Sequence, residues 1–305
     1  MAIFLGIDGG GSKTTCLLGD ETSVLGRGIG GGSNPVRVGE AMSRDALAAA
    51  IRQACVVANI SCSQIEKTCI GLAGAVRPEI SDPVRRFLAE CVGGEIEVVG
   101  DMVIALEAAF GGGAGVIVIA GTGSIAYGRD SKGRIARAGG WGFAISDEGS
   151  GHWIGQCAVG AAVRALDVDE LQPGNQRLLE SLMRSLQVES REQLVVAANA
   201  TPPPDFAALF PVVLLSADQG DTIALGVLTQ AGAELASLAA TVITRLSTPV
   251  RIPSIAMSGG VFVHSSQVRQ SFYNHLRSRY PDATFNPDVI EPARGALEMA
   301  RKLGK

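Results

Sequence analysis

A short apolar segment that runs into glycines and ends on a hydroxyl occurs twice, and this repeat constrains the fold more than any other feature. The first copy is IFLGIDGGGSKT at residues 3–14, and the second is IVIAGTGS at residues 117–124. In each copy an apolar run typical of a β-strand leads into a tight glycine turn. Such a turn can aim backbone N–H groups and a Ser or Thr oxygen at one anion. The repeat therefore predicts two related phosphate loops.

The two copies differ in one charge. The first carries Asp8 where the second carries Ala120. If the loops face each other across a cleft, both can hold phosphate oxygens, while Asp8 adds the negative charge suited to a hydrated Mg²⁺. Alone, the first copy could equally be a β-hairpin turn, because Asp-Gly pairs favour hairpins. A third strand-into-glycine segment, IAMSGG at residues 255–260, adds weight to the functional interpretation.

Length and charge limit the class of protein. The 305 residues are 47% hydrophobic, which is enough for two domains with their own cores. A net charge of -4 and 5% aromatic residues offer neither a basic stripe nor many stacking platforms, so no nucleic-acid partner is expected. We find no apolar run of membrane-spanning length and no secretion leader, so we expect a cytoplasmic protein without a membrane partner.

The six cysteines and three histidines show no metal or catalytic spacing. There is no C-x-x-C pair and no Cys/His cluster of zinc type, so reduced, buried thiols are expected. Cys55, Cys62 and Cys69 recur every seven residues, but a loop is predicted between the first two, and we treat the interval as chance. The histidines are too scattered for a triad.

Predicted strands and helices alternate along the chain, which favours an α/β fold. The glycine run at 111–115 is the expected domain junction, because glycines absorb backbone rotation at little steric cost. We therefore expect one domain over residues 1–110 and another over 111–291. A tail helix over 292–305 is expected to pack on the first domain, and the glycine-rich segment 28–35 is predicted to be a loop.

Two common nucleotide-binding patterns do not occur. Neither G-x-x-x-x-G-K-[ST] nor a helix-opening G-x-G-x-x-G follows the first predicted strand. The P-loop and Rossmann classes are therefore excluded.

The remaining motifs carry a family resemblance. DGGGS at 8–12, GTGS at 121–124 and SGG at 258–260 resemble the phosphate 1, phosphate 2 and adenosine motifs of the sugar kinase, heat-shock protein and actin superfamily. GGWG at 139–142 and SDEGSG at 146–151 are similar to the N-acetylglucosamine kinases and the related BadF/BadG/BcrA/BcrD ATPase group. The resemblance spans nearly the whole chain. It implies an α/β fold of two actin-like (ribonuclease H-like) domains, with a nucleotide and sugar cleft between them.

The resemblance implies ATP and Mg²⁺ as cofactors and transfer of the γ-phosphoryl group to the 6-hydroxyl of an amino sugar. Such chemistry needs an alcohol placed in line, an acceptor for its proton and neutralised phosphate charge. By resemblance Asp101, which follows a predicted strand directly, is the catalytic base. The alternative is a helix N-cap, which an Asp in that position also favours.

The implied sugar contacts come from two regions of the chain. Asn34 matches the family's sugar-binding asparagine, with a turn residue before Pro35 as the alternative. Asp147 matches a carboxylate that grips a sugar hydroxyl, and Trp141 lies in the loop beside the sugar's amide region. Their alternatives are a solvated loop acid and a core aromatic. Further substrate contacts are expected from Ser124 and Gly140.

The implied nucleotide contacts are hydroxyls and glycines. Asp8 is expected to hold Mg²⁺ through water. Phosphate is expected at two hydroxyls and three glycines, and adenosine at two further glycines whose alternative is an ordinary strand-to-helix turn. These residues are Gly10, Gly11, Ser12, Gly121, Thr122, Gly259 and Gly260.

One departure leaves the sugar open. Ile125 stands where the mammalian N-acetylglucosamine kinases carry a sugar-contacting asparagine, whereas Trp141 favours the N-acetylated sugar. We predict an N-acetylglucosamine kinase, a homodimer that acts on a small-molecule amino sugar, with glucosamine kinase as the close alternative. An ATPase activator of a dehydratase or reductase would need cysteines that bridge an iron–sulfur cluster, a spacing this chain lacks. A non-catalytic sugar sensor ranks third.

Overall fold

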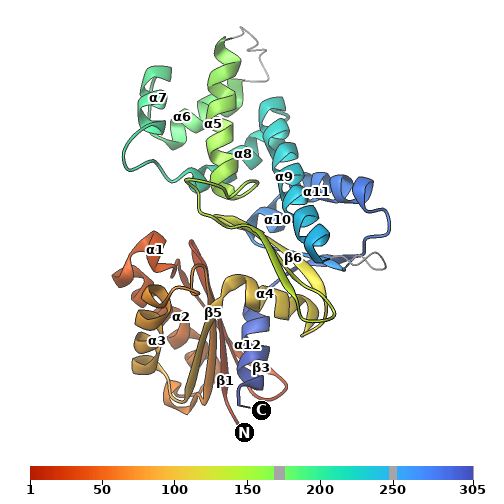
Figure 1. The fold of residues 1–305 in the computed structure, drawn as a ribbon. Helices are drawn as coiled ribbons and strands as arrows, with labels where there is room; N and C mark the ends of the chain where they lie inside the picture. The colour runs from red at the N-terminus through yellow and green to blue at the C-terminus, as the bar shows by residue number, and fades with distance from the viewer. Residues whose placement is uncertain (168–175, 247–252, 305) are drawn as a thin grey trace. The chain divides into compact units, whose positions relative to one another are not determined.

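The computed structural model describes residues 1–167, 176–246 and 253–304 (Figure 1). The chain forms two compact units. Unit 1 comprises residues 1–117, 129–133 and 290–305, and unit 2 comprises residues 118–128 and 134–289. Residues 168–175 and 247–252 of the predicted second domain, and Lys305 of the predicted tail helix, lie outside the described residues.

Unit 1 is built on a mixed five-stranded sheet. Its hairpin-linked strands pair antiparallel (β3 with β2, β2 with β1), and β1, β4 and β5 run parallel. The strand order is β3-β2-β1-β4-β5. The strands are β1 (Phe4–Gly9), β2 (Lys13–Gly19), β3 (Val24–Gly31), β4 (Lys67–Leu72) and β5 (Glu95–Gly100).

A second five-stranded sheet has the order β10-β9-β6-β7-β8. Read from β8 to β10, and with the strands numbered in chain order within the sheet, this order is third, second, first, fourth, fifth. The sheet of unit 1 has the same order from β3 to β5, so the topology is duplicated. The repeated sequence segment opens each sheet at its central first strand. The strands are β6 (Gly115–Ala120), β7 (Ser124–Arg129), β8 (Ile135–Gly139), β9 (Ile255–Ser258) and β10 (Phe285–Ile290).

Helices cover both faces of the sheet in unit 1. Helices α2 and α3 contact one set of strand side chains, and α4 and α12 contact the other, because side chains alternate along a strand. Figure 1 shows the C-terminal helix α12 beside α4. The helices are α1 (Pro35–Val38), α2 (Glu40–Ala58), η1 (Cys62–Gln64), α3 (Pro78–Cys91), α4 (Asp101–Phe110) and α12 (Pro292–Lys302).

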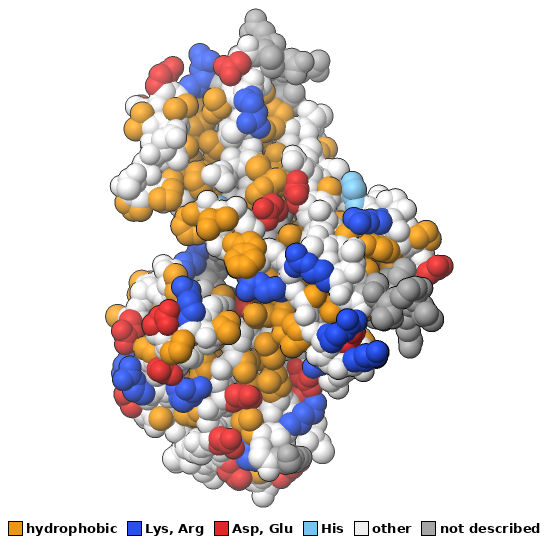
Figure 2. Space-filling model, viewed as in Figure 1, with side chains coloured by type: hydrophobic (Ala, Val, Ile, Leu, Met, Phe, Trp, Pro, Cys, Tyr) orange, Lys and Arg blue, Asp and Glu red, His pale blue; other side chains and the backbone are white. Residues whose placement is uncertain are grey.

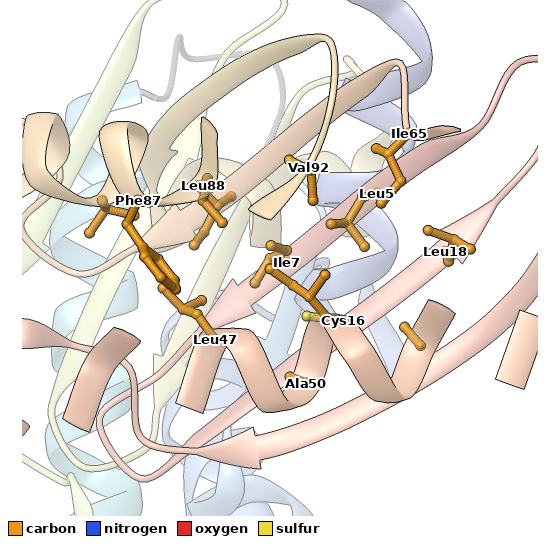
Figure 3. Close-up of a cluster of buried hydrophobic side chains, with 14 of the residues drawn as sticks. Leu5, Ile7, Cys16, Leu18, Leu47, Ala50, Ile65, Phe87, Leu88 and Val92 are labelled. Carbon is orange, nitrogen blue, oxygen red and sulfur yellow. The ribbon is translucent and has the colours of Figure 1, made fainter. Parts of the chain in front are cut away.

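The larger core of unit 1 lies between its sheet and α2 and α3 (Figure 3). Leu5 and Ile7 of β1 point to the same face as Leu18 of β2. They meet Leu47 of α2 and Leu88 of α3, all fully buried. Burial of a Leu or Ile side chain contributes about 1.5–3 kcal/mol, so this layer stabilises the strands that carry the β1–β2 turn.

Strand β3 corrects the predicted loop over residues 28–35, because the strand continues to Gly31. Gly26, Gly28 and Gly30 all face α2. A Cβ atom on Gly28 would overlap the carbonyl oxygen of Ala50 in that helix. The glycines therefore allow α2 to pack directly on the strand backbone. The loop prediction treated these glycines as flexible and did not include this packing.

Unit 2 contains a long apolar helix, α9 (Thr222–Leu246), which packs against α5, α8, α11 and β8. By length and composition alone α9 could cross a membrane, so the expectation that no apolar run is long enough was wrong. One such helix is weak evidence, because core helices pass the same test, and half of its most apolar stretch is buried. The other helices are α5 (Gly151–Asp167), α6 (Gln176–Ser185), α7 (Arg191–Ala198), η2 (Phe206–Leu209), α8 (Phe210–Asp218), α10 (Gly260–His264) and α11 (Ser266–Arg279).

Candidate functional site

The carboxyl ends of the parallel strands in unit 1 gather the first part of the site. Gly9 pairs with Leu72, and Leu72 pairs with Gly100, so β1, β4 and β5 end level with one another. Asp8 near the end of β1 and Asp101 just after β5 therefore lie at the same edge. Adjacent strands are about 4.8 Å apart, which puts β1 and β5 about 10 Å apart. Ligands of open α/β sheets bind at this edge.

Asp8 has a strongly perturbed carboxyl group. It is half-buried, and burial together with the negative charges of Asp101 and Glu291 raises its pKa from 3.8 to about 7. Lys13 opposes this shift to a smaller extent. A carboxylate among other acids is electrostatically unfavourable unless a cation joins them, so Asp8 fits a site that holds a divalent cation.

Glu291 is a neighbour of Asp8 that sequence reasoning missed. It precedes α12 at the N-cap position and forms ion pairs with Arg27 (2.7 Å) and Arg294 (3.2 Å). Its one sequence signal was an acid before Pro292 at the start of a predicted helix, which indicates a helix terminus and no particular ligand.

Asp101 is the first residue of α4, and the N-cap position belongs to Gly100. Its carboxylate accepts a hydrogen bond from the backbone N–H of Met102 at 2.9 Å, so the N-cap alternative does not describe this side chain. The carboxylate is half-buried at the strand-to-helix junction. Its role as a base stays a prediction.

The β1–β2 connection is a tight hairpin turn, as the alternative interpretation of the first glycine segment predicted. The N–H of Gly10 donates to the carbonyl of Lys13 at 2.9 Å. Ser12 is exposed at the tip of the turn. Gly11 precedes it and is partly exposed. A hairpin and an anion loop are compatible, because the same turn can present its outer groups to a ligand.

The segment before α1 is tied to this turn. The carbonyl of Gly10 accepts from the N–H groups of Ser33 (3.0 Å) and Asn34 (3.2 Å). The buried Thr14 hydroxyl lies 2.7 Å from the Ser33 hydroxyl, and Ser43 of α2 donates to the Ser33 carbonyl at 2.7 Å. The predicted sugar residue Asn34 and the predicted phosphate residue Gly10 are therefore held in one hydrogen-bonded assembly.

Asn34 also acts as the local turn residue that was its alternative role. Its side-chain oxygen accepts from the N–H of Val36 at 3.0 Å and caps α1. This contact fixes the direction of the amide group. The predicted sugar contact of Asn34 would use the NH₂ group of the amide, and it stays a prediction.

The second glycine loop, between β6 and β7, rests on the first turn of α5. The N–H of Gly121 donates to the carbonyl of Gly123 at 2.9 Å, which closes the turn. The carbonyls of Gly121 and Thr122 accept from the N–H groups of Gly151 (2.8 Å) and His152 (3.3 Å). A Cβ atom on Gly121 would meet no atom within 4 Å, so this position is open to close approach.

Asp147 supports the same loop from a left-handed backbone conformation with φ of 73°. It is only 8% exposed, so its alternative role as a solvated loop acid is wrong. The N–H of Ser124 donates to its carboxylate at 3.3 Å, and burial raises its pKa. The Ser124 hydroxyl donates to the carbonyl of Glu148 at 2.7 Å, which ties the loop to the 146–151 segment.

Trp141 is 63% exposed, so the core-aromatic alternative is wrong. Its ring lies under the guanidinium of Arg137, 4.2 Å from the ring centroid. Phe143 and Ile145 in the same loop are 56% and 80% exposed. Gly140 precedes Trp141 with a positive φ. The loop therefore presents an apolar surface, and aromatic faces of this kind suit a sugar ring.

Gly259 and Gly260 form the turn between β9 and α10, which is the strand-to-helix turn of their alternative. Gly259 has φ of 99°, and a Cβ atom there would overlap the backbone of Ala120. The turn therefore lies against the start of the second glycine loop. Their predicted contact with adenosine stays a prediction.

The predicted site residues form two groups, one in each unit. In unit 1 the strand ends and the hairpin bring together Asp8, Gly10, Gly11, Ser12, Asn34 and Asp101. In unit 2 the loops around β6, β8 and β9 bring together Gly121, Thr122, Ser124, Gly140, Trp141, Asp147, Gly259 and Gly260. Within residues 1–167, 176–246 and 253–304, no group of three or more His, Cys, Asp or Glu side chains is arranged to hold a metal ion.

The surface charge is mixed. On the face of unit 1 seen in Figure 2, Lys and Arg side chains lie among Asp and Glu side chains. Exposed ion pairs also occur in unit 1, such as Arg44 with Glu90 at 2.9 Å. Interspersed charges of both signs are typical of an ordinary solvated surface.

Two proteins of known name align with the whole chain. A Clostridium acetobutylicum protein named N-acetylmuramic acid/N-acetylglucosamine kinase is 33% identical over 99% of this chain and 99% of its own length. A Dictyostelium discoideum protein named N-acetyl-D-glucosamine kinase is 28% identical over 98% of this chain and 97% of its own.

Solved structures match the fold. A Chromobacterium violaceum structure, provisionally named an N-acetylglucosamine kinase, has a TM-score of 0.77 at 27% identity and covers 97% of this chain and 98% of that one. A ROK family glucokinase from Streptomyces griseus, in complex with glucose and AMPPNP, has a TM-score of 0.60 at 19% identity and covers 99% and 100%. These matches and the duplicated strand order confirm the predicted actin-like α/β fold. The model of the BadF/BadG/BcrA/BcrD ATPase family matches residues 5–300, and this chain belongs to that family.

Proposed function

We propose that this protein is an ATP-dependent hexosamine kinase that phosphorylates the 6-hydroxyl of N-acetylglucosamine. The names of the two aligned relatives support an amino sugar as substrate. The single observation that carries the proposal is the strand register that puts Asp8 and Asp101 at one edge of the unit 1 sheet. Glucosamine is the alternative acceptor, since Ile125 replaces a polar sugar contact of the mammalian enzymes.

In the proposed reaction Asp101 accepts the proton of the attacking hydroxyl. Its carboxylate follows β5 directly, and the hydrogen bond from Met102 restricts its orientation. A positioned carboxylate base contributes about 10²–10⁴-fold to such a transfer. Ser12 and Thr122 donate hydroxyl contacts to phosphate, and the glycines at 10, 11 and 121 allow the backbone to approach it.

Asp8 is the proposed holder of Mg²⁺, through water. Its neighbouring acids create a local excess of negative charge, which is the chemistry that a divalent cation neutralises. In nucleotide sites Mg²⁺ typically takes one or two carboxylates and keeps several waters. When bound, the ion neutralises charge on the phosphates.

The sugar is proposed to lie against Trp141, with Asn34 and Asp147 at its hydroxyls. The oxygen of the Asn34 amide is engaged by Val36, so its NH₂ group is the proposed donor. Asp147 has one carboxylate oxygen turned to Ser124, and its other oxygen is the proposed acceptor. Gly140 and Ser124 are proposed to add contacts, and Gly259 and Gly260 to border the adenosine.

The test of substrate is ADP release from ATP and Mg²⁺ with N-acetylglucosamine, glucosamine, N-acetylmuramic acid, N-acetylmannosamine and glucose in parallel. N-acetylglucosamine should give the highest kcat/KM. A preference for glucosamine would identify the protein as a glucosamine kinase instead. ATP hydrolysis that no sugar accelerates would support the ATPase activator in place of a kinase.

The test of the base is Asp101→Asn, which keeps the shape of the side chain and removes its basicity. We expect kcat to fall about 10²–10⁴-fold while ATP binding, measured by calorimetry, is unchanged. Asp45→Asn is the matched control, since Asp45 is an exposed acid on α2 in the same unit. Near-normal turnover of Asp101→Asn would refute its role. The proposed homodimer is tested separately by light scattering.

A further inference from the structure

Two cysteine side chains of unit 1 meet where α2 ends. Cys55 lies in the last turn of α2, and Cys62 begins η1. Their sulfur atoms are 2.7 Å apart, close to the 2.03–2.05 Å of a disulfide bond. Both thiols are free. The seven-residue interval that was treated as chance therefore has a structural consequence.

The backbone between the two cysteines already holds them together. Asn59 ends α2 in a left-handed conformation with φ of 55°, and the N–H of Ile60 donates to the carbonyl of Cys55 at 3.0 Å. Ser61 and Gln64 exchange hydrogen bonds in a capping box that orders η1. The chain is thus folded back on itself before any covalent bond forms, so closing the ring needs little movement of the backbone.

The two thiols differ in access. Cys55 is 4% exposed within the hydrophobic core, whereas Cys62 is half-buried at its edge. Burial and the neighbouring Cys62 raise the pKa of Cys55 to about 12. A more accessible thiol next to a buried one allows the first to react with an oxidant and the second to resolve the product.

We propose that Cys55 and Cys62 are a redox modification site that forms a reversible intramolecular disulfide with a peroxide as oxidant. The Cys62 thiolate attacks a peroxide oxygen, the O–O bond breaks, and Cys62 becomes a sulfenic acid as hydroxide leaves. The Cys55 sulfur then attacks the Cys62 sulfur, the S–O bond breaks, and water leaves with the Cys55 proton. The hydroxide takes up the proton that Cys62 released on ionisation, so in total two thiols are oxidised by two electrons and one peroxide is reduced to two waters.

The site is separate from the proposed kinase residues. Ser43, which holds the Ser33 carbonyl, lies in the first turn of α2, and Cys55 lies in the last. Twelve residues of helix separate them by about 18 Å. Two further cysteines share this hydrophobic cluster, the fully buried Cys16 of β2 and the half-buried Cys91 at the end of α3. Cys91 is the competing partner for Cys62.

The test measures thiols in the full-length protein. Reduced protein is treated with equimolar hydrogen peroxide, denatured with an alkylating reagent and cleaved after Arg and Lys. Peptide 53–67, which contains Cys55 and Cys62, should appear two hydrogen masses lighter and unalkylated, and dithiothreitol should restore both alkylation sites. Alkylated cysteines should fall from six to four.

Variants separate the proposed pair from other thiols. Cys91→Ser should still form the disulfide, whereas Cys62→Ser should keep its five remaining thiols alkylatable. Cys62 is preferred to Cys55 for substitution because the buried Cys55 contributes to the core. Oxidation should raise the melting temperature of the wild type and not of Cys62→Ser. Full alkylation of peptide 53–67 after peroxide, or a link from Cys62 to Cys91, would overturn the proposal.

Discussion

Substituting Asp8 with Asn should stabilise the metal-free protein at neutral pH while it abolishes the proposed activity. The carboxyl of Asp8 has its pKa raised from 3.8 to about 7 by burial and by Asp101 and Glu291. Asn has nearly the same shape and no charge. The carboxylate charge proposed to bind the cation is therefore predicted to destabilise the folded protein when no cation is present.

The sign follows from proton binding. Between about pH 4 and pH 7 the folded chain keeps a proton on Asp8 that the unfolded chain has released, so stability falls as pH rises through this range. A shift of about three units corresponds to about 4 kcal/mol at full effect. Because Asp8 is only half-buried, solvent screens part of this, and we expect about 2–4 kcal/mol.

The assay is equilibrium urea unfolding with a metal chelator at about pH 4.5, 6 and 8, a range that begins above the unfolded-state pKa of 3.8 and passes through the folded-state pKa of about 7. Both tryptophans, Trp141 and Trp153, lie in unit 2, so tryptophan fluorescence does not report directly on unit 1. The unfolding of unit 1 is therefore followed by pulse hydrogen exchange of peptides from β1. The stability difference between Asp8→Asn and wild type should grow with pH. Asp45→Asn, a change of the same charge on the surface of α2, should show a flat difference. An Asp8→Asn advantage that does not grow with pH would refute the reasoning.

Three further substitutions test the packing and the loops. Gly28→Ala forces a Cβ into the backbone of α2 and should cost about 1–3 kcal/mol or more in urea unfolding. Its control Gly226→Ala, in open space on α9, should gain about 0.5–1 kcal/mol. Thr14→Val leaves the buried Ser33 hydroxyl without its partner and should cost about 1–3 kcal/mol. The sugar KM should rise because Ser33 precedes Asn34 in the same hydrogen-bonded assembly, and an unchanged KM would show that this assembly does not position Asn34. Trp141→Ala should change stability by about 1 kcal/mol or less, because the ring is exposed, yet raise the N-acetylglucosamine KM about tenfold. A loss of stability without a KM effect would make Trp141 structural.

The fold was largely accessible from the sequence because its signals are local. Each copy of the repeated segment is an apolar run followed by glycines, and both became the first strand and first turn of a sheet. The resemblance added the actin-like topology. Pairings between distant strands, such as β1 with β4, have no local signal, and the strand order comes from the structure.

Errors arose where residue type and environment disagree. Gly28 and Gly30 indicate a loop by composition, but in β3 they allow α2 to approach the strand backbone, and this approach depends on a helix elsewhere in the chain. Helix α9 has the length of a membrane span and packs against other elements of unit 2. Composition alone does not distinguish these cases.

Sequence motifs predicted which residues belong to the site, but they did not predict whether each side chain is buried or exposed. Asp147 in a polar loop segment is buried, whereas Trp141 is exposed, which reverses both alternatives drawn from residue type. Glu291 carried only a helix-start signal, because its proximity to Asp8 arises when α12 returns to unit 1. Cys55 and Cys62 meet through a left-handed residue at Asn59, a turn that spacing did not reveal.

The most direct test of the proposed function is to identify the reaction product. Protein, ATP, Mg²⁺ and N-acetylglucosamine are incubated together, and the phosphorus-containing products are resolved by ³¹P–¹H correlation NMR. The proposal predicts one new phosphomonoester coupled to the two protons on C6, formed in equal amount with ADP and absent with Asp101→Asn. ADP formed with inorganic phosphate alone, or a phosphate on another carbon of the sugar, would contradict it.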